Sequence, residues 1–546
     1  MVPTGEWLTN VGAIMKKWIP LVVLSLAQFL MVLDQAVMNV AISQLVEDFD
    51  TTVTTIQGVI TLYALVMATL MITGGKVGDM IGRRRAFVIG LVIYGAGSAL
   101  TAGSWSVPSL IVGWSVLEGI GAALVLPALV ALLAANYRGR DRITAFGVIG
   151  GVAGVGIAAG PIVGGFFTTQ LSWRWVFVGE VIIALIIVLT ARLIGDAKLT
   201  GRRPNLDVVG SVLSAIGLGL IVLGMLKASS WGWLSPKESP IEPFGFALTP
   251  FVILAGGVVL ALFVRWQHHR VAHGLDPLVR MELLSVPPLR SGLGCFLSQN
   301  LILLGVFFIL PLYLQIVLGF DALETGIKML PISIAMFITS SSGPLLAGRF
   351  GPRRVVQAGF VLLIMAAFGM LQAIKPELDG FGFGLTLAIL GVAMGLIASQ
   401  LGSVIQSSVG PEERGEAGGL QYTAQQVGSA IGTALIGAVV VSSLVAAFVN
   451  NITAEVAIPA DLTSAIEIEV ASGSSFVAAD QVAVALAEAG VEDPDVDAVV
   501  EEYRNAQLAS LKVGLLLAGF LAIASLAFTR HLPGKEVDPE EVLTSA

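Results

Sequence analysis

The sequence contains few charged residues and almost no cysteine. Only 12% of its 546 residues are charged, against roughly a quarter in ordinary soluble domains, and 55% are apolar, with a mean hydropathy of +0.88. This composition excludes a water-soluble enzyme. The single cysteine, Cys295, excludes an internal disulfide. The four histidines lie in hydrophilic connections without the spacing of a metal site, so no metal is expected.

The sequence also lacks a phosphate-binding loop of the Gly-x-x-x-x-Gly-Lys-Ser/Thr type and any soluble stretch long enough for a nucleotide-binding domain. Direct use of ATP is therefore not expected. Any work that the protein performs would draw on ion gradients, where one charge crossing 100 mV is worth about 2.3 kcal/mol. No cofactor and no nucleic-acid partner are expected.

Long apolar runs dominate the sequence. A helical crossing needs about 20 apolar residues, so fourteen crossings would use about 280 residues. The runs lack the alternation of a barrel strand. The sequence therefore predicts an all-α membrane protein whose fourteen helices lie at 18–45, 54–73, 86–104, 108–134, 143–168, 174–195, 207–227, 247–266, 290–318, 325–347, 355–374, 383–405, 418–446 and 509–529.

The positions of lysine and arginine predict the orientation. With the N-terminus inside, the cytoplasmic segments hold 23 of the 30 basic residues, and cytoplasmic connections retain Lys and Arg. The apolar stretch after Lys17 is too long for a signal peptide and lacks a small-residue cleavage site. We expect a multi-pass protein of the inner (cytoplasmic) membrane, surrounded by the lipid bilayer, with cytoplasmic termini at 1–17 and 530–546.

One acidic segment stands apart from the spans. Residues 447–508 hold twelve acidic residues and one basic residue, Arg504, for a net charge of −11. The stretches 476–489 and 496–511 have helix-like apolar spacing, which predicts a small external helical hairpin. Two roles stay open for this segment: solubility alone, or attraction of cations to the exit side.

Two connections resemble each other and indicate an internal repeat. The loop Gly75–Arg85 and the loop Ala347–Arg354 align with Gly82 on Gly351, so that their Arg-Arg pairs coincide. The repeat predicts two six-helix bundles, 18–195 and 290–529, with an inserted two-helix hairpin within 196–289. Repeats of this kind place a substrate site at their interface near the middle of the membrane.

Three motifs carry a resemblance to a known family. The loop resembles the signature loop of the major facilitator superfamily through Gly75, Gly78, Asp79, Gly82, Arg83, Arg84 and Arg85. The stretch 156–165 resembles the antiporter signature of its drug exporters through Gly156, Gly160, Pro161, Gly164 and Gly165. The stretch 33–41 resembles the first-helix motif of the fourteen-span drug/proton antiporters. The resemblance implies the major facilitator fold and a transporter, which we expect to be a monomer.

The resemblance implies a gating role for the loop. In the family, the Asp of this loop, here Asp79, pairs with a nearby arginine and caps the cytoplasmic start of a helix in the opposite half, which would be span thirteen. The second copy has Gly348 in place of Asp79, so this latch would be one-sided. The alternative is that the loop only orients the chain.

The fifth span carries a strip of small residues. Gly156, Gly160 and Gly164 recur every four residues, which permits two helix backbones to approach closely. Pro161 removes one helical hydrogen bond and is expected to kink the span. The resemblance implies that this seam seals the two halves against leak, whereas close packing alone is the alternative.

Three carboxylates lie deep in apolar spans. Asp34, Glu118 and Glu180 are about 12, 10 and 8 residues from the outer ends of spans one, four and six, which corresponds to depths of roughly 18, 15 and 12 Å. An unpaired charge there costs several kcal/mol, so such residues are usually functional. They are candidates for proton and cation coupling, and a structural, hydrogen-bonded acid is the alternative for each of them. In the family spans one and four line the cavity while span six is peripheral, so we rank the candidates Asp34, Glu118 and Glu180.

The fourth span departs from the family pattern. The family reads Arg-x-x-Gln-Gly where this chain has Ser115-Val116-Leu117-Glu118-Gly119. The arginine tied to proton handling is absent, and an acid replaces the glutamine. The acidic layer consequently lacks an evident cationic partner, which suits a positively charged substrate.

Neutral polar and aromatic residues complete the candidate cavity. In the C-terminal half no acid lies deep, and the candidates there are Gln299, Asn300, Phe307 and Gln425, together with Gln28 and Asn39 of the first span. Aromatic rings offer surface for flat apolar cations. Polar contacts between helices are the alternative role for the amides.

These features predict a proton-coupled secondary exporter of amphipathic, cationic small molecules that works by alternating access. An exporter of a specific metabolite, lipid or peptide on the same fold is an alternative. A membrane-embedded enzyme such as an acyltransferase and a ligand sensor without transport are alternatives of other classes.

Overall fold

The computed structural model describes residues 4–535 except positions 52, 197–204, 237–238, 455–475, 477 and 489–492. The side chains of some helical residues, Asn39 and Pro161 among them, also lie outside the described set. Every regular element in the described part of the chain is helical. The described part of the chain contains fourteen helical segments that are long and apolar enough to cross a membrane. This confirms the predicted all-α class and number of spans.

The elements follow the predicted runs closely. In chain order the principal ones are α1 (Thr4–Val40), α2 (Ile42–Asp48), α3 (Val53–Ile81), α4 (Arg83–Ala102), α5 (Val107–Leu110), the π-helix η1 (Ile111–Glu118), α6 (Gly119–Asn136), α7 (Gly139–Gln170), α8 (Arg174–Thr190), α9 (Val208–Trp231), α10 (Leu248–Ala272), α11 (Pro287–Pro311), the π-helix η5 (Leu312–Val317), α12 (Ala322–Phe350), α13 (Pro352–Ala373), α14 (Gly380–Ser407), α15 (Arg414–Ala454), α17 (Ala479–Glu488) and α18 (Asp493–Ser525).

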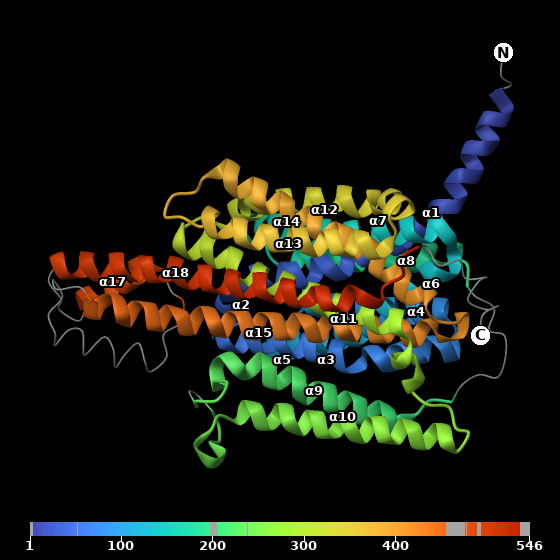
Figure 1. Ribbon diagram of the computed structural model, residues 1–546, viewed down its shortest axis with the longest axis horizontal. Helices are drawn as coiled ribbons and strands as arrows, with labels where there is room; N and C mark the ends of the chain where they lie inside the picture. The colour runs from blue at the N-terminus through green and yellow to red at the C-terminus, as the bar shows by residue number, and fades with distance from the viewer. Residues whose placement is uncertain are drawn as a thin grey trace.

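The helices assemble into two bundles and a hairpin. The helices α1 to α8 surround one buried apolar core, and α11 to α18 surround a second one. The helices α9 and α10 pack on each other as a hairpin. They run along one side of the molecule, next to α3 and α15 (Figure 1). The start of α1 and the end of α18 lie at the same end of the molecule, as an even number of crossings requires (Figure 1).

The first span differs from its predicted bounds. The helix α1 starts at Thr4, well before the expected position 18, and its first turns project beyond the bundle (Figure 1). It ends at Val40, and α2 continues the chain to Asp48 as a separate short helix. The apolar run at 18–45 therefore contains a helix end that its hydropathy does not reveal.

The predicted repeat has a backbone counterpart. Gly82 between α3 and α4 has φ 102°, and Gly351 between α12 and α13 has φ 81°. Only glycine adopts this region without strain, so the two aligned loops make the same tight turn. Both loops lie at one end of the bundles: Gly75 of the first loop faces Gly415 at the start of α15, and Gly348 of the second loop faces Arg140 at the start of α7. We call this the arginine-rich end.

At the opposite end, two helices extend beyond the bundles. The helix α15 has 41 residues and α18 has 33, or about 60 and 50 Å at 1.5 Å per residue, against about 30 Å for a bilayer core. The short helix α17 packs on their projecting ends through Phe448, Leu486 and Tyr503 (Figure 1). The predicted hairpin thus appears in altered form, since its second helix is continuous with the last span.

Candidate functional site

The three deep carboxylates meet in the structure. Asp34 on α1, Glu118 at the end of η1 and Glu180 on α8 each place a carboxylate oxygen within 4.8 Å of the others. Their exposed fractions are 0%, 0% and 1%. The group is called the carboxylate triad below. The resemblance places span six at the periphery, but the side chain of Glu180 is buried and joins the other two acids.

Each acid receives hydrogen bonds from neutral donors. The indole Nε1 of Trp114 donates to Asp34 Oδ1 at 2.7 Å. Thr101 Oγ1 donates to Glu118 Oε1 at 3.2 Å. Glu180 Oε2 accepts from the hydroxyls of Tyr94 and Ser98, both at 3.2 Å. These donors come from α4 and η1, so the triad lies inside the N-terminal bundle.

The other oxygen of each acid has no partner among the described residues. These atoms are Asp34 Oδ2, Glu118 Oε2 and Glu180 Oε1, and all three are buried. None of the ion pairs found in the described part of the chain includes a triad carboxylate. Three ionised acids so close together and out of water would repel one another strongly. The arrangement suits uptake of protons, and its oxygen spacing also suits a hard cation.

A π-helix sets the position of Glu118. The wide turns of η1 run from Ile111 to Glu118 before α6 resumes the regular α-helix. Such segments occur often at functional sites because they redirect side chains. Ser115, in the place of the family arginine, donates to the carbonyl of Val59 on α3 at 2.8 Å. The missing arginine is thus replaced by a helix-to-helix contact, which leaves the triad without a basic neighbour in this turn.

Sequence reasoning missed the donors around the triad. Trp114 also stacks on Tyr63, with ring centroids 4.4 Å apart and an interplanar angle of 9°. The only available signal was a polar face on span three, where Tyr94, Ser98 and Thr101 recur at helical spacing. Such residues are common in the interior of membrane bundles, so this signal does not single out a site.

A second polar group lies where the two halves meet. Tyr422 of α15 donates to Gln28 Oε1 of α1 at 3.1 Å, which joins the two bundles. The side-chain amides of Gln35 and Gln426 approach the sulfur of Met67 on α3, at 3.6 and 3.9 Å. Gln35 directly follows Asp34, so α1 turns one side chain toward the triad and the next toward this interface.

Two of the amide candidates in the C-terminal half form hydrogen bonds within their own bundle. Gln299 is buried and donates to the carbonyl of Met394 on α14 at 3.3 Å. Asn300 is half-buried and donates to Phe296 of its own helix at 3.0 Å. Phe307 and Gln425 are half-buried, and Asn39 falls outside the described side chains. A substrate role for these residues stays a prediction.

The signature loop contacts the opposite half at the start of α15. Arg83 Nε donates to Asp79 Oδ1 at 3.1 Å, and Arg83 Nη2 donates to the carbonyl of Pro411 at 2.6 Å. Asp79 lies directly against Gly415, where a Cβ would collide with both carboxylate oxygens. The backbones of Gly75 and Gly415 are equally close. This is the placement that the resemblance implies for Asp79.

Three further residues of the loop, Gly78, Gly82 and Arg84, hold its turn in place. Gly78 faces Ala86 on α4, and Gly82 makes the turn itself. Arg84 bonds to Asp196 and to the carbonyl of Ile194, while Arg85 is exposed. In the second copy, Gly348 faces the Arg140 guanidinium of the other half, with no acid at this position. The two copies therefore contact the opposite half through different residues.

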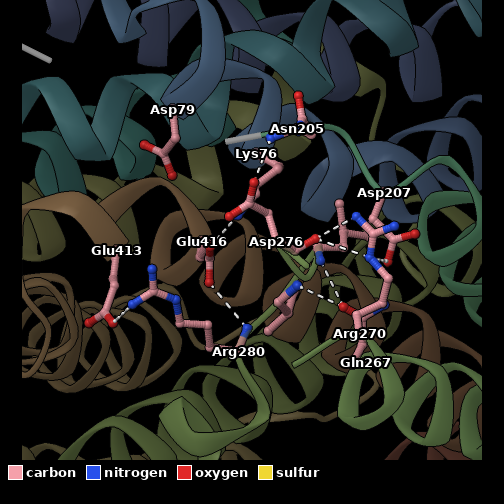
Figure 2. Close-up of polar contacts among 12 residues, drawn as sticks. Lys76, Asp79, Asn205, Asp207, Gln267, Arg270, Asp276, Arg280, Glu413 and Glu416 are labelled. Carbon is pink, nitrogen blue, oxygen red and sulfur yellow. Dashed lines mark hydrogen bonds and ion pairs between the residues drawn. The ribbon is translucent and has the colours of Figure 1, made fainter. Parts of the chain in front are cut away.

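A buried ion pair missed by sequence reasoning lies beside the loop. Lys76 of α3 donates to Glu416 Oε1 of α15 at 2.7 Å, and both side chains are 4% exposed (Figure 2). The pair joins the N-terminal to the C-terminal bundle. Together with the Asp79–Gly415 contact it closes the arginine-rich end, and we call these contacts the latch.

The glycines of α7 pack on two different neighbours. A Cβ on Gly156, Gly160 or Gly164 would contact Val32, Ala36 or Val37 of α1, in the same bundle. The other face of α7, with Gly151 and Gly154, packs on Phe337 and Met336 of α12 in the opposite bundle, and Gly165 lies near Leu323. The predicted strip thus fixes α1 on α7, while the neighbouring face forms the contact between the halves. A role in preventing leak stays a prediction.

Two helical bundles joined at one end by a latch, with three buried acids inside one of them, are an architecture typical of secondary transporters. Comparison with protein families places the chain more narrowly. The model of the Major Facilitator Superfamily matches residues 24–433, so the chain belongs to this superfamily.

Several curated relatives are resistance and export proteins. The tetracenomycin C resistance and export protein of Streptomyces glaucescens is 28% identical over 431 residues, covering 78% of this chain and 76% of the relative. The puromycin resistance protein pur8 of Streptomyces alboniger is 32% identical over 434 residues, covering 78% and 82%. The methyl viologen resistance protein SmvA of Salmonella typhimurium is 28% identical over 512 residues, covering 93% and 96%.

Solved structures of transporters share the fold. The human organic anion transporter MFSD10 has a TM-score of 0.56 at 16% identity, covering 93% of this chain and 99% of that one. The proton:xylose symporter XylE has a TM-score of 0.59 at 13% identity, covering 97% and 99%. At these identities the likeness concerns the fold alone.

Proposed function

We propose that the chain is a secondary exporter that moves amphipathic, cationic small molecules out of the cell in exchange for protons. The observation that carries the proposal is the carboxylate triad, with three buried acids within 4.8 Å and a free oxygen on each. Protons neutralise such a site, and an arriving cation favours their release. Exchange of one for the other gives antiport.

Export is supported by the relatives, which confer resistance to or export puromycin, tetracenomycin C and methyl viologen. The polar group between the halves suits compounds of this kind. Gln28, Gln35, Met67 and Tyr422 combine amide, thioether and aromatic groups, which bind varied apolar molecules without a fixed charge pattern.

The transport cycle would be alternating access in the cytoplasmic membrane, by a single chain. The positive-inside rule assigns the arginine-rich end to the cytoplasm, with both termini there. The bundles 18–195 and 290–529 would rock against each other, and the latch would close the cytoplasmic side. Coupling would pass through α1, because it carries Asp34 of the triad and Gln35 at the interface.

The test uses purified protein in liposomes with an imposed pH difference. Uptake of ethidium, a planar cation, and proton movement are recorded together for Asp34→Asn, Glu118→Gln and Glu180→Gln. We expect each substitution to abolish uphill transport, because the triad then exchanges fewer protons. Glu47→Gln, which removes an exposed carboxylate on α2, is the matched control and should transport normally.

The alternatives give different results in the same experiment. Uphill transport by all three variants would contradict the proposal. Transport driven by a Na⁺ gradient without proton movement would make the triad a metal-cation site. Transport of one metabolite, lipid or peptide but no dye would indicate a specific exporter. Group transfer without vectorial movement would indicate an enzyme, and tight binding without flux a sensor.

A further inference from the structure

The inserted hairpin spans the boundary between the two bundles. Val222 of α9 packs between Ala68 of α3 and Ala430 of α15, so one helix touches both halves. Nearer the arginine-rich end, Leu218 of α9 joins a second apolar cluster with Ile72 of α3. The hairpin therefore lies across the boundary between the two bundles.

The connection after α10 is held tightly against this hairpin. Gln267 is fully buried, and its Oε1 accepts from the amides of Leu278 at 2.7 Å and Val279 at 3.4 Å. Its Nε2 donates to Asp207 at the start of α9, at 2.8 Å. Leu278 and Val279 are themselves fully buried in the cluster next to α3. One glutamine thus fixes the connection to both helices of the hairpin (Figure 2).

The next residue of the connection reaches the latch. The amide of Arg280 donates to Glu416 Oε2 at 3.2 Å, while Lys76 occupies Oε1 (Figure 2). The Arg280 guanidinium donates to Glu413 Oε1 at 2.8 Å. Each oxygen of the buried Glu416 therefore has its own donor, and one of the donors belongs to the hairpin connection.

From this geometry we infer that the hairpin α9–α10 and its connection position Glu416 for Lys76 and so stabilise the closed arginine-rich end. Arg280 and Gln267 are positioning residues for the latch. A buried carboxylate pairs well only when its remaining lone pairs are satisfied, and Arg280 supplies that bond. Opening of this end separates α3 from α15 and must break these bonds. The inference rests on the alternating access proposed above.

The test measures how far the arginine-rich end opens. Spin labels are placed at Arg85 and Arg354, which are exposed and lie at corresponding positions of the two halves. The native Cys295 is buried and is replaced by alanine. Distances are recorded in nanodiscs, on the full chain, without substrate or pH difference.

Four variants separate the contributions. Arg280→Pro removes both donors of Arg280, the backbone amide and the guanidinium. The backbone φ of −74° at this position is one that proline adopts. Arg280→Ala keeps the amide, Arg280→Lys keeps the amide and the charge, and Gln267→Met releases the connection without touching the latch. We expect Arg280→Pro and Gln267→Met to raise the long-distance population about threefold or more, Arg280→Ala less, and Arg280→Lys hardly at all. Arg290→Ala, an exposed arginine on the same side, is the control.

Distances that match the Arg290→Ala control in both Arg280→Pro and Gln267→Met would overturn the inference and leave the hairpin a passive insertion. Should Gln267→Met fold poorly, Arg280→Pro and Arg280→Ala decide alone, because Arg280 is half exposed at its side chain. The readout needs no transport. A failure of the proton-exchange proposal is thus distinguishable from a failure of this one.

Discussion

At the scale of single residues, each triad acid accepts hydrogen bonds on one oxygen and keeps the other free. A hydrogen bond to a carboxylate favours its ionised form, whereas burial and the neighbouring acids favour the neutral form. In the proposed mechanism the donors would therefore adjust how tightly the triad holds a proton. Trp114 makes the shortest of these bonds, at 2.7 Å to Asp34.

Trp114→Phe keeps the ring that stacks on Tyr63 and removes the indole N–H. The proton on the triad is then held more tightly, because ionised Asp34 loses its donor while Glu118 and Glu180 remain close. We expect the pH at which exchange is half-maximal to rise by about one unit. The measurement is dye–proton exchange in liposomes across a pH series. Trp105→Phe, at a 76% exposed tryptophan, is the control, and superimposable profiles for the two variants would refute the role of the indole.

Sequence reasoning found the acids and not their donors. Asp34, Glu118 and Glu180 were detectable because charge in a long apolar run is expensive. Trp114 and Tyr94 were not, because aromatic residues in such runs usually only pack. Hydropathy does not indicate that Glu180 meets the other two acids, because the direction of a side chain depends on the rotation of α8 about its axis.

At the scale of helices, α7 packs against both bundles. Its glycines let α1 of its own bundle approach on one face and α12 of the opposite bundle on the other. Close backbone approach replaces side-chain interdigitation here. A side chain added at a contact point must push the helices apart, while the same change at an open position has no such effect.

Gly160→Val should destabilise the protein by about 1–3 kcal/mol, because the new side chain collides with Ala36 of α1. Gly179→Val on α8 is the matched control, since a Cβ there has nothing within 4 Å. Thermal unfolding followed by loss of the monodisperse peak in size-exclusion chromatography compares the two. Equal midpoints would show that the α1–α7 contact is loose.

The latch gives a second prediction at this scale. Lys76→Glu places two carboxylates face to face in a buried site, and an unpaired buried charge costs about 3–5 kcal/mol. We expect transport to fall about tenfold or more, and the double variant Lys76→Glu/Glu416→Lys to recover part of it. Lys17→Glu, in a pair with Asp141 that is 49% and 42% exposed, should have little effect. A double variant no better than the single one would speak against the pair.

The spans were predictable and their ends were not. All fourteen apolar runs form helices, because hydropathy over about 20 residues is a strong signal. The break of α1 at Val40 and the continuity of α18 with the segment before the last span depend on tertiary packing. The ion pair of Lys76 with Glu416 joins residues 340 positions apart, so no local pattern indicates it.

At the scale of the whole molecule, the triad and the interface between the halves are separate places joined by α1. The triad is enclosed by the N-terminal bundle, while Gln28 and Gln35 of the same helix meet α15 and α3. A substrate at the interface would therefore act on the protons through movement of α1. The repeat in the sequence predicts a site at the interface between two halves, whereas the structure encloses the three acids within the N-terminal bundle.

The central claim is that substrate and protons compete through the triad. Its most direct test is proton release by purified protein in weakly buffered solution when ethidium is added, followed with a pH-sensitive dye. We predict acidification that saturates with ethidium binding. The variant Asp34→Asn/Glu118→Gln/Glu180→Gln should release no protons, and Glu47→Gln should release as many as the native chain. Ethidium binding without proton release by the native chain, or equal release by the triple variant, would contradict the account.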